Sequence, residues 1–186
     1  MGKVYDHLDD TLTRFIKKQP MFFVATAPLS GDAHINLSPK GLDSFRVLDS
    51  NTVAYLDLTG SGVETIAHIR ENRRITLMFC AFTGPPKVLR LYGDGEALEP
   101  GDRRFEELKP QFPDLIGARS IIVVRLTRIA DSCGYAIPLM DYRGERNQLI
   151  EWGERKGNAG IIDYRRGHNV VSIDGLAGLR SAAVDD

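Results

Sequence analysis

The residues best suited to chemistry in this sequence lie in two short polar segments. In the first, His-Ile-Asn-Leu-Ser-Pro-Lys-Gly at residues 34–41, the side chains of Asn36, Ser38 and Lys40 occupy alternate positions. Alternate residues of a strand point to the same face, so an ammonium group would lie beside an amide and a hydroxyl, a combination that can bind an anion. The other interpretation is a half-exposed strand whose polar face meets water.

The second segment, Thr-Gly-Ser-Gly at residues 59–62, joins an apolar strand to a helix. The free N–H groups at the start of a helix favour a phosphate, glycine lets it approach the backbone, and hydroxyls can donate to its oxygens. The residues that could do so here are Thr59, Ser61, Gly62 and Thr65. A capping box formed by Ser61 and Glu64 would explain the same pattern without a ligand.

A third segment offers two more cations. Lys87 follows two prolines and begins a strand in which Val88 and Arg90 share a face. These cations could complete an anion site or lie on the surface as ordinary charges. No general base stands out, so the sequence assigns no catalytic residue. The two cysteines are too few and too far apart for a zinc site or a disulfide framework.

The elements that must position these segments are short strands with a few helices between them. Helical spacing of apolar residues predicts a first helix over residues 6–18, and the capping pattern predicts another from Ser61 to near Asn72. A third helix is expected over residues 103–108, after Asp102. Strands are predicted near residues 21–27, 33–38, 45–58, 75–82, 87–99 and 120–134. Because no strand–helix–strand rhythm repeats, we expect a mainly β, mostly antiparallel barrel or sheet of six to seven strands with added helices.

The chain changes character after Gly134. Residues 142–156 read as a polar helix, and the residues from Asn169 onward show no periodicity. We therefore divide the chain into a domain over residues 1–133 and a C-terminal extension over residues 134–186. The extension is expected to pack on the barrel or on a partner subunit.

Net charge and hydrophobic pattern indicate which kinds of partner the protein binds and where in the cell it is expected. The 186 residues carry a net charge of −1, which indicates no basic surface for nucleic acid or an anionic membrane. The first residues lack the apolar core of a signal peptide, and no apolar run reaches membrane-spanning length. We therefore expect a cytoplasmic protein that binds neither nucleic acid nor a membrane.

The order of these segments resembles the pyridoxamine 5′-phosphate oxidase-like family, the FMN-binding split barrel. The resemblance extends from Phe22 to Ile129 and is most specific over residues 55–79, YLDLTGSGVETIAHIRENRRITLMF. It implies a split β-barrel, a homodimer, and FMN bound at the interface between the two subunits. The vitamin-forming oxidases of the family carry an arginine and a lysine in the turn where this chain has Gly-Ser-Gly-Val-Glu-Thr. The phosphate charge would then have to come from Lys40, Lys87 or Arg90.

Carried across by position, the resemblance implies a set of cofactor contacts. Asn36 and Ser38 would face the flavin or its ribityl chain, and Lys40 would bind the phosphate. Lys87 and Val88 would reach the flavin from the partner subunit. The complete implied set is Asn36, Ser38, Lys40, Thr59, Ser61, Gly62, Thr65, Lys87, Val88 and Arg90.

The resemblance implies an FMN-dependent oxidoreductase acting on a small molecule that the sequence does not identify. Two alternatives stay open: a non-catalytic flavin- or haem-binding carrier or sensor, and a dimerising domain without cofactor. Related split barrels hold haem or a deazaflavin, and haem would need an axial ligand such as His34, His68 or His168. Arg166 and His168 have the spacing of the substrate-reading Arg-x-His of the vitamin-forming oxidases, but the surrounding sequence differs, so that substrate is not implied.

Overall fold

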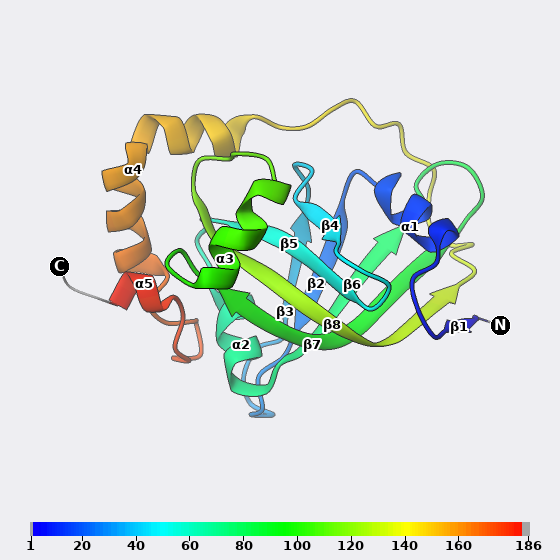
Figure 1. The fold of residues 1–186 in the computed structure, drawn as a ribbon, viewed down its shortest axis with the longest axis horizontal. Coiled ribbons are helices and arrows are strands. Elements are labelled where there is room, and N and C mark those ends of the chain that lie inside the picture. The colour runs from blue at the N-terminus through cyan, green and yellow to red at the C-terminus, as the bar shows by residue number, and fades with distance from the viewer. Residues whose placement is uncertain (1, 184–186) are drawn as a thin grey trace.

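Eight strands form one antiparallel sheet in the computed structural model of this protein, which describes residues 2–183. The strands are β1 (Val4–Tyr5), β2 (Phe22–Thr26), β3 (Asn36–Lys40), β4 (Phe45–Val47), β5 (Thr52–Leu58), β6 (Arg74–Cys80), β7 (Val88–Leu98) and β8 (Ala118–Ser132). Their order is β3-β2-β6-β7-β8-β5-β4, with β1 paired to β8 off this path. Within the described residues the end strands β3 and β4 do not pair with each other. The expected split β-barrel is confirmed (Figure 1).

The interior of the barrel is filled by the alternate side chains of its strands. Phe22, Phe45, Tyr55 and Phe79 form an aromatic cluster whose ring centroids lie 5.0 to 5.5 Å apart. Fully burying a phenylalanine side chain, as at Phe22 and Phe79, contributes roughly 1.5–3 kcal/mol. Tyr55 is fully buried, so the polar end of this ring lies inside the core.

The helices lie around the barrel. They are α1 (Asp10–Lys17), α2 (Glu64–Asn72), α3 (Arg103–Leu108), α4 (Gln148–His168) and α5 (Arg180–Ala183), with a short 3₁₀ turn η1 (Lys109–Gln111). The Asp9 carboxylate caps α1 by accepting from the Leu12 N–H at 2.7 Å. Helix α1 buries Leu12 and Ile16, as its apolar spacing predicts. Helix α3 has the expected bounds. None of the described helices is both long and apolar enough to cross a bilayer.

The start of α2 corrects the sequence-based expectation. The helix begins at Glu64 rather than Ser61, with Val63 at the N-cap and no side-chain cap. The capping box is therefore wrong. The Glu64 carboxylate instead accepts from the backbone N–H of Ile173 at 3.3 Å, because the C-terminal part of the chain lies against this turn. The predicted end near Asn72 is correct.

After β8 the chain runs over the top of the sheet and then descends along its left side as α4 (Figure 1). The expected helix over 142–156 begins later, at Gln148, and continues to His168 with a kink at Gly157, where φ is 65°. Beyond it, Leu179 and Ala182 lie in the main core. The buried Glu99 carboxylate accepts from the backbone N–H groups of Arg180 and Ser181 at 3.1 and 2.8 Å. This end of the chain is thus bound to its own barrel.

Strand β3 turns its polar side inward and its apolar side outward. Asn36, Ser38 and Lys40 are half-buried, as their alternation predicts. On the other side, Ile35 and Leu37 are 77% and 65% exposed. An exposed apolar stripe on an end strand is a feature that soluble monomers generally avoid.

Candidate functional site

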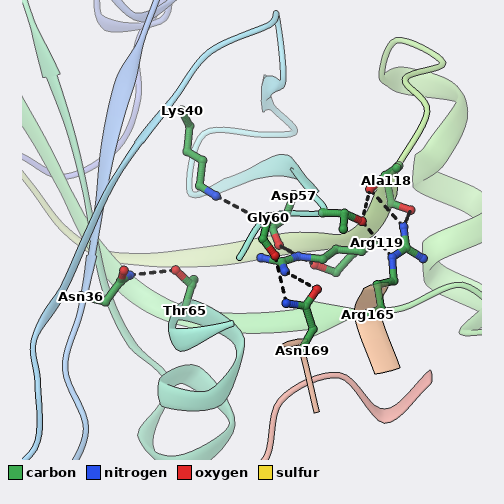
Figure 2. A network of polar contacts seen from close by, with 12 residues as sticks. Asn36, Lys40, Asp57, Gly60, Thr65, Ala118, Arg119, Arg165 and Asn169 are labelled. Atoms are coloured by element: carbon green, nitrogen blue, oxygen red, sulfur yellow. Dashed lines mark hydrogen bonds and ion pairs between the residues drawn. The ribbon is translucent and has the colours of Figure 1, made fainter. Parts of the chain in front are cut away.

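The two polar segments singled out in the sequence meet in space. The Asn36 amide donates to the Thr65 hydroxyl at 2.9 Å and to the Thr26 hydroxyl at 3.2 Å. The Ser38 hydroxyl donates to Oδ1 of the Asn36 side chain at 2.9 Å. Since Thr65 lies in the first turn of α2, these bonds hold the polar side of β3 against the start of that helix (Figure 2).

Lys40 extends from the end of β3 to a carboxylate that was not among the predicted site residues. Its Nζ lies 2.8 Å from Asp57 Oδ1, and the Asp57 side chain is 1% exposed. Asp57 comes from β5, the strand that leads into the Thr59–Gly62 turn. The Lys40 ammonium is therefore anchored beside this turn rather than extended into solvent.

Arg119 binds the other oxygen of the same carboxylate. Its Nε lies 2.7 Å from Asp57 Oδ2, and its side chain is 5% exposed. In the β5–β8 pair, Asp57 lies opposite Ser120 and Leu58 lies opposite Ala118, which leaves Arg119 as the extra residue of a bulge. Bulges of this kind redirect side chains, often next to active sites. Here the bulge directs a guanidinium toward Asp57.

The network continues into the C-terminal extension. Nη1 of Arg119 donates to Oδ1 of the Asn169 side chain at 2.9 Å. The side-chain amide of Asn169 in turn donates to the main-chain carbonyl of Gly60 at 3.0 Å. Arg165 donates from Nε to the Thr59 hydroxyl at 2.8 Å. It also donates from Nη2 to two main-chain carbonyls at 3.0 Å, those of Gly117 and Ala118. Figure 2 shows these contacts gathered around the turn after β5.

The electrostatics fix the protonation of this cluster. Burial alone would raise the pKa of Asp57, but the charges of Arg119 and Lys40 outweigh it and lower that pKa to about 2. Burial raises the pKa of Tyr55 well above its ordinary value, and the Asp57 charge adds to this rise. Burial also lowers the pKa of Arg165 to about 10, with a further contribution from the Arg119 charge. At neutral pH the Asp57 carboxylate is ionised, the Tyr55 phenol is protonated and the Arg165 guanidinium is charged.

The turn itself is arranged differently from the expectation. Ser61 is exposed, and Gly62 lies against the Glu64 side chain, since a Cβ on residue 62 would collide with Glu64 Oε2. Gly62 therefore makes room for a carboxylate of its own chain. Thr59 is buried, with its hydroxyl donating to the Gly117 carbonyl at 2.8 Å.

The third predicted segment lies elsewhere in the same chain. Lys87 Nζ lies 3.3 Å from Asp131 Oδ2, and Arg90 Nη1 donates to the Ser132 hydroxyl at 3.1 Å. Val88 is buried. Asp131 and Ser132 end β8, whereas Arg119 lies at its start. Across residues 2–183, the third segment shares no hydrogen bond or ion pair with the Asp57 cluster.

The three histidines considered as axial ligands of haem have different surroundings. His34 Nδ1 lies 2.7 Å from Asp174 Oδ1. His68 is fully buried, with Nδ1 3.0 Å from the Thr26 hydroxyl. His168 stacks on Tyr164 with 4.2 Å between ring centroids.

A cavity of about 540 Å³ adjoins Lys40 at the end of β3. Its walls are mostly apolar and include Pro39, Leu42, Tyr142 and Leu149, from β3, the loop that follows it, and the start of the C-terminal extension. In that loop Leu42 and Asp43 adopt positive φ angles of 60° and 51°. Non-glycine residues in this conformation cost of order 1–3 kcal/mol each and are concentrated at ligand sites.

Five residues of this site were missed from the sequence: Tyr55, Asp57, Arg119, Arg165 and Asn169. Asp57 carried a signal, because it is a lone charge in an otherwise apolar strand, VAYLDL. Arg119 carried a weaker signal, because it is a charged residue directly before the mostly apolar segment that starts at Ser120. Arg165 and Asn169 carried none, since their partners lie far away along the chain.

Two comparisons with known proteins match the chain to the same family. A family model described as pyridoxamine 5′-phosphate oxidase matches residues 8–133. The pyridoxamine 5′-phosphate oxidase family protein ustO of Aspergillus flavus is 40% identical over 198 residues, covering 97% of this chain and 79% of that protein.

Two solved structures share the fold. HupZ from Group A Streptococcus superposes with a TM-score of 0.50 at 20% identity, over 66% of this chain and 91% of its own. A protein from Lactobacillus delbrueckii, described as a candidate pyridoxamine 5′-phosphate oxidase, gives a TM-score of 0.50 at 19% identity. The superposition covers 68% of this chain and 98% of that protein. At these identities the likeness concerns the fold alone.

Proposed function

Since the chain belongs to the pyridoxamine 5′-phosphate oxidase family, we propose that it binds FMN at a homodimer interface and acts as an FMN-dependent oxidoreductase on a small molecule. The observation that carries the proposal is the hydrogen bond between Asn36 and Thr65. It brings the polar side of β3 and the start of α2 together at one place, where a phosphate and a polyhydroxyl chain could be bound side by side.

The residues present fit such a ligand. Within the described chain, two buried side-chain atoms lack a well-formed hydrogen bond, His68 Nε2 and the Tyr55 hydroxyl, whose oxygen has only the Thr65 hydroxyl beside it. Buried polar atoms are almost always paired, so partners from outside the chain are expected here. Tyr55 borders Lys40, whose Nζ lies 5.9 Å from the ring centroid, and His68 is bonded to Thr26, itself a partner of Asn36.

In this proposal each polar group has a stated task. Lys40 and the turn from Thr59 to Thr65 bind the phosphate, and Asn36 and Ser38 bind the ribityl chain or the ring. The flavin, when bound, supplies the redox chemistry, while the protein orients it and shapes access to it. The cavity beside Lys40 is the proposed route for the small molecule.

The homodimer is proposed for two reasons. Ile35 and Leu37 form an exposed apolar stripe on β3, and covering it would remove apolar surface from water. Lys87, Val88 and Arg90 are remote from the cluster of their own chain, so in this proposal they reach the flavin from a second copy.

The domain division and the location are also proposals. We retain a barrel domain over residues 1–133 and an extension over residues 134–186. We retain a cytoplasmic location, since both cysteines are free thiols, the state that a reducing compartment maintains.

The absorbance spectrum of the purified protein, with mass identification of any extracted pigment, tests the proposal. A flavin spectrum that releases FMN supports it, and turnover with a reductant and an electron acceptor would support the oxidoreductase activity. A Soret band would mean that the cofactor is haem rather than FMN, and extraction of a deazaflavin would mean that it is a deazaflavin. A colourless protein that takes up no added FMN would contradict the proposal.

A further inference from the structure

The charges around the turn after β5 do not cancel. Lys40, Arg119 and Arg165 are positive, and Asp57 is the carboxylate bonded to the first two of them. We call these four residues the cationic cluster. The buried Glu99 carboxylate also acts on Arg165, but it is already paired with Arg70 and Arg180. The three cations of the cluster therefore face one carboxylate of their own, and two positive charges remain in excess. Figure 2 shows the three cations reaching the Asp57–Gly60 segment from three different elements.

This excess lies largely out of water. The side chains of Asp57, Arg119 and Lys40 are 1%, 5% and 21% exposed, and Arg165 is half-buried. Charges in such surroundings are costly unless they are compensated. The two guanidiniums are also close enough for the Arg119 charge to lower the pKa of Arg165. An anion placed among them would relieve this repulsion.

A hydrogen-bond donor in the same place is unused. The Tyr55 hydroxyl is fully buried, and within the described residues it donates no hydrogen bond. The neighbouring Thr65 hydroxyl interacts with its oxygen, which lowers the Tyr55 pKa slightly against the larger rise from burial, and the ring lies beside Lys40. A guanidinium has five N–H donors. Arg119 uses two of them, the Nε–H for Asp57 and one Nη1–H for Asn169. The cluster therefore combines surplus positive charge with unspent donors, and it needs an acceptor-rich anion.

A phosphate monoester meets both requirements. It carries about −1.5 to −2 charges at neutral pH and three acceptor oxygens. We infer that Arg119 and Arg165, together with Lys40 and the Tyr55 hydroxyl, bind the phosphate monoester of this protein's ligand. The inference deepens the proposed function, on which it rests for the identity of that monoester as FMN. The Thr59–Gly62 turn has no cation of its own, so the charge comes from β8 and α4.

A purely structural role for Arg165 makes a different prediction. Its bonds to Thr59, Gly117 and Ala118 could serve only to hold α4 on the barrel. In that case its loss would lower stability and weaken every ligand alike. A phosphate-binding role instead affects only ligands that carry a phosphate.

The test compares FMN, riboflavin and inorganic phosphate on four proteins: wild type, Arg165→Gln, Arg165→Lys, and the control Arg155→Gln, which changes an exposed arginine of the same helix. We expect Arg165→Gln to weaken FMN at least tenfold while riboflavin affinity stays within twofold. Arg165→Lys should retain part of the FMN affinity. Inorganic phosphate, at constant ionic strength, should raise the melting temperature of wild type and control but not of Arg165→Gln.

Each outcome decides the matter. Equal losses for FMN and riboflavin, or no loss for either, would overturn the inference. If wild type binds no flavin but phosphate still raises its melting temperature through Arg165, the proposed function fails and the anion site stands. Should Arg165→Gln not fold, Arg119→Lys serves the same comparison, because it keeps a charge near Asp57 but removes the guanidinium donors.

Discussion

Arg119 and Asp57 form an ion pair that is almost entirely removed from water, with 2.7 Å between Nε and Oδ2. Such a pair is stable only when further hydrogen bonds satisfy both partners. Here Lys40 binds the second carboxylate oxygen and Asn169 accepts from the guanidinium. The four segments that meet at this pair, β3, β5, β8 and the C-terminal extension, therefore depend on one another.

Asp57→Asn should strongly destabilise the fold. The change leaves Arg119 and Lys40 without their counter-charge, and breaking a buried pair in this way costs about 3–5 kcal/mol. Urea unfolding measures the loss. Asp94→Asn is the control, because Asp94 pairs with Arg125 at the surface and such pairs contribute about 0–1 kcal/mol. An Asp57→Asn variant as stable as the control would mean that the pair is not formed in solution.

The same pair predicts how stability depends on pH. Because the pKa of Asp57 is lowered to about 2 in the folded protein, its contribution is present above the unfolded pKa of about 3.9 and is lost as pH falls toward 2. The difference amounts to about 2–3 kcal/mol. The stabilities of wild type and Asp57→Asn, measured from pH 6 to 2.5, should therefore converge at the acid end. Parallel curves would contradict the assignment.

Lys40→Ala should weaken FMN binding by about 1.5–3 kcal/mol, the contribution of a hydrogen bond to a charged group. Flavin fluorescence on titration measures the affinity. Lys109→Ala is the matched control, since Lys109 also pairs with an aspartate, Asp114, but at the surface. Equal affinities of Lys40→Ala and the control would remove Lys40 from the phosphate site.

Leu37→Asp should convert the proposed dimer to a monomer, because it places a charge in the apolar stripe of β3. Light scattering gives the molar mass, and the melting temperature of the isolated subunit should change little, since Leu37 is 65% exposed. Leu139→Asp, in another exposed apolar position, should leave the mass unchanged. A wild-type protein that is already monomeric would end this part of the proposal.

Elements whose partners are local or periodic could be predicted from the sequence. The alternation of Asn36, Ser38 and Lys40 correctly predicts that they share one side of β3, because a strand has a period of two whatever it packs against. The bounds of α3 are also correct. The pattern does not say which side of a strand faces inward, and here the polar side does.

Elements whose partners are distant could not be predicted. The capping box at Ser61 failed because Glu64 is bound by the N–H of Ile173, 109 positions away. Arg165 reaches Thr59 across 106 positions. Local patterns contain no information about such contacts, so the sequence pointed to Lys40, together with Lys87 and Arg90, but not to Arg119 or Arg165.

The kink at Gly157 has a consequence for the order in which the protein is made. It turns the last long helix so that Arg165 and Asn169 reach a turn that was synthesised about a hundred residues earlier. The ribosome must therefore deliver every strand of the barrel before the turn acquires these two partners. A nascent chain halted after β8 would possess the barrel strands yet leave Arg119 without Asn169 and Thr59 without Arg165, so this junction would be among the last contacts that the polypeptide gains.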